Sequence, residues 1–386
     1  MWSRVFFDPQ IRKFHIPKKR REVRVSLWYA GVNNSFTLKE VTDMRRKIGF
    51  AVAGLLLATM FAITLSPAPV AAGPIKLSYA NFPPAPTFPC VQMERWKKEV
   101  EARTGGKVAI STYPGGTLLG AKNMMDGVIA GQADIGCLCM AYQPGRFIVT
   151  NATALPLGFP NATVASLALW DLYEKYKPEE FSEVKVLTMF TCAPANIYAK
   201  VPVKSLEDLK GLELRASGGV LQAMKALGAA PVGMPQSETP EALQKGVVKG
   251  AVSSLETLKD FKYAETCKYV TIINGPIYPF AVVMNKDKWD TLPEDVKKVM
   301  DGMSVEQARW TGDYMDNHVN ESIEWSKKNH NIEITTLTQK ELARWNKLLK
   351  PITEKWSEEA KAKGLPARTI LKDIKVALEY HSRFPF

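Results

Sequence analysis

The chain has 386 residues, with 51 Lys and Arg against 39 Asp and Glu, which gives a formal net charge of +12. Apolar residues make up 46% and charged residues 23%, which excludes collagen-like, mucin-like and wholly disordered chains. Only one stretch is apolar enough to span a bilayer, so a polytopic membrane protein is also excluded. Residues 1–72 hold 12 Lys or Arg and 4 Asp or Glu, a balance of +8. The remaining +4 does not favour a nucleic-acid partner.

The positively charged first part contains the pattern of a secretory signal. Basic residues at 45–47 precede an apolar run at 48–65, and SPAPVAA follows at 66–72. This predicts a signal peptide over 44–72, cut between Ala72 and Gly73, and hence a secreted protein. The alternative is a retained membrane anchor, because 18 apolar residues could just span.

Residues 1–43 precede that signal and include the basic run KKRRE at 18–22. A nucleic-acid-binding arm is one interpretation. We favour translation from Met44, which would make 1–43 a start-site artefact or a disordered extension. Mass spectrometry of the N-terminus of the secreted protein would distinguish the two.

The chain after residue 73 begins with alternating strand and helix patterns. Strands are expected at 75–80, 107–113 and 133–139, with helical stretches near 90–103 and 119–130. Apolar strands with helices between them predict parallel pairing and a sheet covered on both faces.

A second unit of the same kind begins near residue 195. Ser205 and Asp208 have the spacing of a capping box at a helix start. Strands are expected in NIYAK, LELRAS and AVSS, with helices between them, and KYVTII and YPFAVVMN are expected to return toward the first unit. This predicts a second sheet.

The last hundred residues are mostly helical. Long helical patterns cover 292–329 and 338–364, around a strand at 332–337, and Thr338 with Glu341 forms a second capping box. The fold class is therefore α/β, with two lobes, a ligand cleft between them and long C-terminal helices. Such clefts bind small ligands.

No catalytic or metal-binding set is evident in the sequence. Cys137 and Cys139 are two apart on an expected strand and share a face, but a metal site would need further ligands. The five cysteines are an odd number, so at least one is unpaired within the chain. TGGKV at 104–108 lacks the Ser or Thr of a phosphate loop. We expect no metal and no cofactor, and a binding protein rather than an enzyme.

Seven short motifs along the chain occur in an order that is typical of one protein family. They are YPGGTLLG (113–120), AGQADIG (130–136), ALPLGF (154–159), VKSLEDLKGLELR (203–215), GAAPVGMPQSE (228–238), EALQKGVVKGAV (241–252) and NKDKWDTLPEDV (285–296). Together they resemble the DctP-type solute-binding proteins of tripartite ATP-independent periplasmic (TRAP) transporters, over nearly all of 74–350.

The resemblance implies a monomeric two-lobed receptor that lies in the periplasm and closes on a small organic acid. It also implies delivery to the small and large membrane subunits of a TRAP permease. Lobe one would comprise 74–194 plus 281–386, and lobe two 195–280.

Arg215 matches the family arginine that grips the ligand carboxylate. A guanidinium offers two parallel N–H donors that match a carboxylate, and the pair strengthens in a closed cleft. The resemblance implies further pocket positions, and they are Asn81, Phe82, Cys139, Gln236, Ser253 and Ser254. We further expect the body of the ligand to pack against Phe82, Met234 and Tyr278.

The chain departs from its relatives at several of these places. Ala195 stands where some relatives have a second arginine, and Cys139 where some have an acidic residue; Lys249 and Pro240 replace a common aspartate and tyrosine. A less polar pocket predicts a monocarboxylate with an apolar or aromatic body, since unpaired buried polar groups cost about 1 to 3 kcal/mol each. Two alternatives stay open: a secreted ligand sensor, and a secreted enzyme with Cys139 as nucleophile.

Overall fold

The computed structural model describes residues 24–26, 35–37, 39–40, 42–49, 51–53 and 73–384. The chain divides into two compact units, Met1–Ala72 and Gly73–Phe386. In the first unit, β1 (Arg24–Ser26) pairs antiparallel with β2 (Ser35–Thr37), within the segment that the sequence marks as an artefact or a disordered extension. Most of the expected signal segment, and its cleavage point after Ala72, lie outside the described residues.

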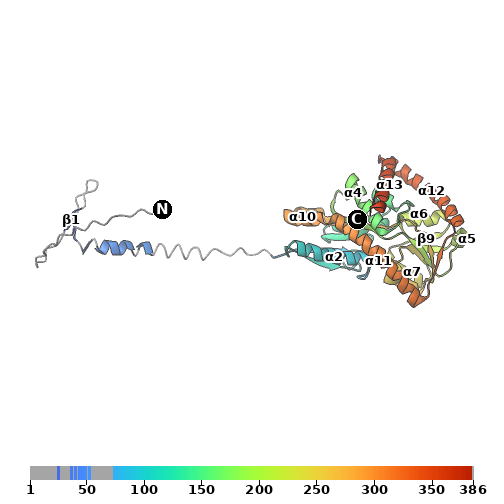
Figure 1. Ribbon diagram of the computed structural model, residues 1–386, viewed down its shortest axis with the longest axis horizontal. Helices are drawn as coiled ribbons and strands as arrows, with labels where there is room; N and C mark the ends of the chain where they lie inside the picture. The colour runs from blue at the N-terminus through green and yellow to red at the C-terminus, as the bar shows by residue number, and fades with distance from the viewer. Residues whose placement is uncertain are drawn as a thin grey trace, which may run out of the picture. The chain divides into compact units, whose positions relative to one another are not determined.

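The second unit is built on two sheets covered by helices (Figure 1). Lobe one is the part on the five-stranded sheet, with strand order β4-β3-β5-β12-β6, and lobe two the part on the six-stranded sheet, with order β13-β11-β7-β10-β8-β9. The strands of lobe one are β3 (Ile75–Asn81), β4 (Val108–Tyr113), β5 (Ile135–Cys139), β6 (Val184–Thr191) and β12 (Pro279–Asn285). The strands of lobe two are β7 (Asn196–Ala199), β8 (Glu213–Ala216), β9 (Ala230–Gly233), β10 (Gly250–Ser253), β11 (Tyr269–Ile272) and β13 (Glu333–Thr336). The predicted fold class is confirmed.

Each sheet contains one strand that runs against its neighbours. β3 lies parallel to β4 and β5, and β8 lies parallel to β9 and β10, as the alternation of strands and helices predicts. β12 instead is antiparallel to β5 and β6, and β7 is antiparallel to β10 and β11. The parallel pairing predicted for the first three strands is therefore confirmed, whereas the antiparallel directions of β7 and β12 were not predicted. Both exceptional strands enter their sheet directly from the other lobe, which reverses their direction.

The helices separate by lobe. In Figure 1, α2 and α4 lie toward one end of the second unit and α5, α6 and α7 toward the other. The helices before residue 303 are α2 (Phe88–Arg103), α3 (Met124–Ile129), α4 (Ala162–Tyr176), α5 (Leu206–Leu209), α6 (Gly218–Ala226), α7 (Thr239–Gln244), α8 (Thr257–Asp260), α9 (Lys286–Asp290) and α10 (Glu294–Gly302). The short 3₁₀ helices are η1 (Met140–Tyr142), η2 (Thr150–Ala154), η3 (Glu179–Phe181), η4 (Gln236–Glu238) and η5 (Tyr263–Glu265).

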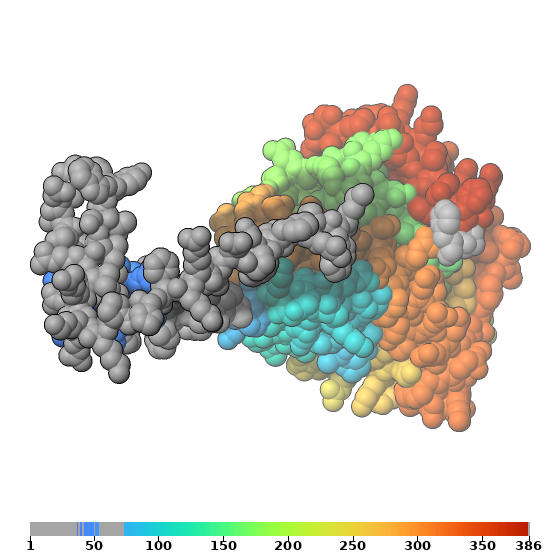
Figure 2. Space-filling model, turned by 60° about the vertical axis from the view of Figure 1, so that its left-hand side comes forward, coloured from blue at the N-terminus to red at the C-terminus, as the bar shows by residue number. Residues whose placement is uncertain are grey.

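The C-terminal region differs from the expected division of the chain. The helical pattern at 292–329 forms two helices, α10 and α11 (Ser304–His330). β13 pairs parallel with β11, so this strand belongs to lobe two and not to lobe one, and β11, expected to return toward lobe one, stays in lobe two. α12 (Gln339–Ala362) and α13 (Ala367–Arg383) follow. α13 packs against α4 of lobe one, where the red C-terminal helices lie beside the green segment in Figure 2.

Helix α11 has contacts with both lobes. In lobe one, the Thr188 hydroxyl donates to the Ser304 carbonyl at 2.8 Å. In lobe two, the Ser322 hydroxyl donates to the Leu255 carbonyl at 2.8 Å. Between these points Asp316 caps α4: its Oδ1 accepts from the Ala162 amide at 2.7 Å. The helix therefore connects the lobes beside the cleft.

The cap made by Asp316 predicts a measurable loss of stability. Its Oδ2 also accepts from the amide and the hydroxyl of Thr163, at 3.1 and 2.8 Å. Asp316→Ala should lower the free energy of unfolding by about 1 to 2 kcal/mol, because it leaves free amides at the start of α4. Urea unfolding measures the change. Glu324→Ala, which removes an exposed ion pair on the same helix, is the control and should change little. Equal effects of the two substitutions would contradict the capping role.

Candidate functional site

Arg215 is a fully buried arginine on the sheet of lobe two. It lies on β8, next to Ala251 of β10 and Val232 of β9, and only 1% of its surface is exposed. Its Nε donates to the Met234 carbonyl at 2.9 Å, and its Nη2 donates to the Ser217 hydroxyl at 3.4 Å. These bonds fix the guanidinium at the C-terminal edge of the sheet.

The charge of Arg215 has no anionic partner among the described residues. Nη2 also donates to the Tyr142 hydroxyl at 3.2 Å, but Nη1 has no hydrogen-bond partner within residues 73–384. Burial acts against the charged form, yet the hydroxyls of nearby tyrosines, Tyr142 and Tyr278 foremost, leave the pKa of Arg215 above its usual value. A charged guanidinium with a free donor can receive a carboxylate.

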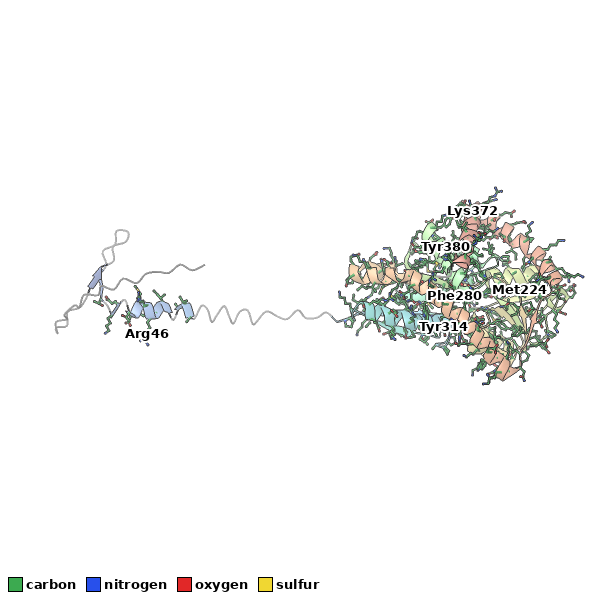
Figure 3. The ribbon with its side chains drawn as sticks, viewed as in Figure 1. Arg46, Met224, Phe280, Tyr314, Lys372 and Tyr380 are labelled. Atoms are coloured by element: carbon green, nitrogen blue, oxygen red, sulfur yellow. The ribbon has the colours of Figure 1, made fainter. Side chains whose placement is uncertain are left out.

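Arg215 lines a cavity whose free volume is about 40 Å³. Aromatic rings form much of its wall: Phe82 stacks on Phe280 with 6.4 Å between ring centroids, and Phe88 meets Phe280 edge-on at 5.3 Å. Phe280, labelled in Figure 3, comes from β12, an inner strand of the lobe-one sheet. The lining residues are Phe82, Pro83, Thr87, Phe88, Pro89, Tyr142, Cys192, Arg215, Gln236, Ser253, Glu256, Thr257, Asp260, Phe261, Tyr278 and Phe280.

Both lobes meet at this cavity. The hydroxyl of Tyr142, on η1 of lobe one, accepts two hydrogen bonds from lobe two. One comes from Nη2 of Arg215 at 3.2 Å and the other from the backbone amide of Gln236 at 3.1 Å. Lys122 and Glu238 form an exposed ion pair from lobe one to lobe two at 3.3 Å. The structure is therefore a closed arrangement, in which the lobes are bonded to each other around the buried guanidinium.

Five of the nine positions expected at the pocket line this cavity. They are Phe82, Arg215, Gln236, Ser253 and Tyr278. The Tyr278 hydroxyl donates to the Val252 carbonyl at 2.9 Å and accepts from the Ser217 amide at 3.3 Å. These polar bonds hold the Tyr278 ring beside Arg215, where the guanidinium carbon lies 5.6 Å from the ring centroid.

The other four expected positions are not in the cavity wall. The Asn81 amide is bonded within lobe one, where it donates to the Pro89 carbonyl at 2.9 Å. Met234 contributes its backbone carbonyl, which accepts a hydrogen bond from Nε of Arg215. Ser254 is buried, and its hydroxyl has no partner in the described part of the chain. Cys139 is buried at the end of β5. Backbone and core roles account for the placement of Asn81, Met234 and Cys139, but not for the unpartnered Ser254 hydroxyl.

The enzyme alternative required Cys139 to be a reactive thiolate. Burial raises the pKa of Cys139 to about 12, so the side chain stays a thiol at neutral pH. All five cysteines are buried and unpaired. Within the described residues there is also no group of three His, Cys, Asp or Glu that could hold a metal ion.

The sequence missed the acidic side of the cavity. Glu256, which precedes α8, and Asp260, at the end of α8, both line it, although the loss of an acidic group was expected. Burial, and then the charge of Asp260, raise the pKa of Glu256 to about 7. Asp260 accepts from His318 Nε2 at 2.8 Å, and this bond raises the pKa of His318. Tyr142 and Phe88 were missed as well.

The raised pKa of Glu256 predicts how stability depends on pH. The pKa of this carboxyl group is 4.5 in the unfolded chain and about 7 in the folded protein. Its contribution to the free energy of unfolding is therefore complete below about pH 4.5 and is lost as the pH rises through 7. The ligand-free protein should therefore lose on the order of 2 kcal/mol between pH 5 and 8 through this group. His318 acts in the same direction. Glu256→Gln should flatten the fall in melting temperature, and an unchanged slope in this variant would contradict the prediction.

Two α/β lobes that close over a buried cation in an aromatic cavity define a solute-binding protein of the periplasmic type. The sequence profile of the bacterial extracellular solute-binding proteins, family 7 (DctP), matches residues 83–359. The chain belongs to this family, which confirms the resemblance to DctP-type TRAP solute-binding proteins. No helix within the described residues is both long and apolar enough to cross a membrane.

Three relatives illustrate the range of the similarity. A C4-dicarboxylate-binding periplasmic protein of Rhodobacter capsulatus is 32% identical over 171 residues, 44% of this chain and 51% of that protein. A TRAP solute-binding protein of Desulfovibrio salexigens, in an open form, is 56% identical over 79% of this chain and 95% of its own, with a TM-score of 0.72. A marine metagenome protein specific for aromatic acids, bound to 3-hydroxybenzoate, is 28% identical over 80% of this chain and 99% of its own, with a TM-score of 0.76.

Proposed function

We propose that this protein is the periplasmic receptor of a TRAP-type transporter and that it binds a monocarboxylate with an apolar or aromatic body. The observation that carries the proposal is the buried guanidinium of Arg215, which has a free donor and no anionic partner among the described residues, inside a cavity walled by phenylalanines. A ligand carboxylate would neutralise this charge, and its hydrophobic body would fill the space between the rings.

Among the residues that the structure describes, Arg215 is the one Lys or Arg that lines the cavity, and this favours a monocarboxylate over a dicarboxylate. Ala195, where some relatives have an arginine, is fully buried and supplies no charge. The second carboxylate of a C4-dicarboxylate would share the cavity with Glu256 and Asp260, which would oppose it. The aromatic-acid specificity of the marine relative fits this choice better than the dicarboxylate specificity of the relative from Rhodobacter capsulatus.

Delivery of the ligand to a membrane permease is part of the same proposal. The family membership supports it, and so does the closed arrangement of the two lobes. The predicted signal segment before residue 73 would direct the protein to the periplasm. Uptake of radiolabelled ligand by cells should be lost when the gene for the receptor is deleted. Normal uptake with loss of a ligand-induced response would indicate the sensor alternative.

The ligand can be identified in two steps. Native mass spectrometry of the purified protein reports any acid that co-purifies with it. Calorimetry then compares benzoate, phenylacetate, succinate and a hydroxylated sugar acid on protein freed of ligand. We expect an aromatic monocarboxylate to bind most tightly. Tight binding of the sugar acid or of succinate, with no binding of the aromatic acids, would overturn the proposed ligand class.

A further inference from the structure

Glu256 presents a second, unused polar group to the cavity. The residue is 3% exposed and lines the same cavity as Arg215. Its Oε2 atom has no hydrogen-bond partner in the described part of the chain, and no Lys, Arg or His within 73–384 forms an ion pair with it. Buried polar atoms of proteins are nearly always bonded, so an orphan carboxyl oxygen in a binding cavity suggests a partner that comes with the ligand.

Asp260 presents a second orphan oxygen one helical turn later. The spacing of four residues places the two carboxyl groups on one face of α8. Oδ1 of Asp260 is held by His318, but Oδ2 has no partner among the described residues, and 4% of the side chain is exposed. Within the part of the chain that the structure describes, the lining residues therefore hold one donor without an acceptor, at Arg215, and three acceptor oxygens without donors. Two of these oxygens belong to the neighbouring carboxyl groups of Glu256 and Asp260, and the third is Oε1 of Gln236.

The surrounding contacts hold these acceptors in place. The Ser322 hydroxyl of α11 donates to the carbonyls of Leu255 and Glu256, at 2.8 and 3.2 Å, and to no side chain of the acidic pair. The Lys259 amide in turn donates to Ser322 at 3.2 Å. The backbone of α8 is thus fixed against α11 while the free carboxyl oxygens remain available. Such preorganised acceptors bind a donor without first having to be ordered.

We propose that the ligand carries, besides its carboxylate, a hydrogen-bond donor that Glu256 accepts with the help of Asp260. The substrate class is then an aromatic monocarboxylate that bears a hydroxyl or amino group on its body. The carboxylate would lie at Arg215 and the donor at Glu256 and Asp260. Each end of the ligand would therefore be recognised by a different side of the cavity. This inference rests on the proposed receptor function and narrows its ligand.

The test compares ligands that differ only in the donor. Calorimetry on ligand-free protein uses benzoate, its three hydroxy isomers and 3-(aminomethyl)benzoate, with wild type, Glu256→Leu and Glu256→Gln. At least one substituted acid should bind wild type tenfold or more tightly than benzoate. Glu256→Leu, which has no acceptor, should reduce this ratio to about one, whereas Glu256→Gln keeps an acceptor oxygen and should retain part of it. Preference for a hydroxy isomer identifies a neutral donor, and preference for the aminomethyl acid identifies a cation.

Several results would overturn the inference. If wild type binds benzoate as tightly as every substituted acid, the donor is not recognised, although the receptor function stands. If the ratio is the same in Glu256→Leu, another residue reads the donor. If no aromatic acid binds at all, both the inference and the proposed ligand class fail. If the leucine variant does not fold, the wild-type ratios still decide whether the donor is recognised, and Glu256→Gln still tests the role of Glu256.

Discussion

Replacement of Arg215 by methionine is expected to weaken binding of the ligand by a factor between about 30 and several thousand. This factor corresponds to a loss of roughly 2 to 5 kcal/mol of binding free energy. The carboxylate would enter a closed aromatic cavity without its counter-charge. Arg215→Lys should fall between wild type and the methionine variant, because an ammonium keeps the charge but not the two parallel donors. Calorimetry with the tightest acid from the panel measures these differences.

The same substitution should cost little stability in the absence of ligand. The Met234 carbonyl, which accepts from Arg215, also accepts from the Ser217 hydroxyl at 2.9 Å. The Tyr142 hydroxyl likewise keeps its bond from the Gln236 amide. The Ser217 hydroxyl loses the bond that it accepts from Arg215 but still donates to the Met234 carbonyl. Removing the guanidinium therefore leaves each of its three acceptor groups with another hydrogen bond, and it removes an uncompensated buried charge. Melting temperatures with and without ligand separate binding from folding. Arg344→Met, at an exposed arginine of α12, is the control. An unchanged affinity of Arg215→Met would refute the anchoring role.

The second large effect is expected at Gly219, where the lobes approach closely. A Cβ atom at this position would lie 2.3 Å from the Ala154 carbonyl oxygen and 3.3 Å from its Cβ. Gly219 belongs to α6 of lobe two, and Ala154 belongs to η2 of lobe one. Gly219→Ala should therefore force the closed lobes apart and weaken ligand binding by about 5- to 150-fold, the cost of overpacking by roughly 1 to 3 kcal/mol.

A matched glycine separates this effect from helix propensity. Gly302 ends α10, and a Cβ atom added there would have no other atom within 4 Å, so Gly302→Ala adds the same methyl group in open space. It should leave ligand affinity unchanged. Small-angle scattering with ligand should show the Gly219→Ala variant to be less compact than wild type. Wild-type affinity in Gly219→Ala would mean that the lobes need not approach this closely on binding.

The two sides of the cavity differ in how far the sequence predicts them. Arg215 can be predicted because a run of matched residues surrounds it and its chemistry fits a carboxylate. Glu256 and Asp260 cannot, because acidic residues four apart on a short helix are ordinarily exposed. Their burial depends on α11, which packs against α8 from a distant part of the chain. Asn81 was expected to touch ligand, but its amide is used to hold the Pro89 carbonyl.

The fold shows a similar division. The capping residues Ser205 and Thr338 start their helices as predicted, because the cap is a local interaction. The directions of β7 and β12 were not predicted, since alternating strands and helices do not reveal which strand arrives from the other lobe. Phe280 likewise reads as an ordinary strand residue, and only the pairing of β12 with β5 and β6 brings it to the cavity.

The position of β12 also determines the order in which the lobes can be completed during synthesis. β12 lies between β5 and β6, so β6 has no neighbour in its sheet until residues 279–285 have been made. Five of the six strands of lobe two, in contrast, come from the continuous stretch 196–272, and only the edge strand β13 arrives later. Lobe two can therefore assemble before lobe one, although lobe one begins first in the chain. Neither lobe can be cut out as a single complete fragment, because β12 of lobe one lies in the chain between β11 and β13 of lobe two.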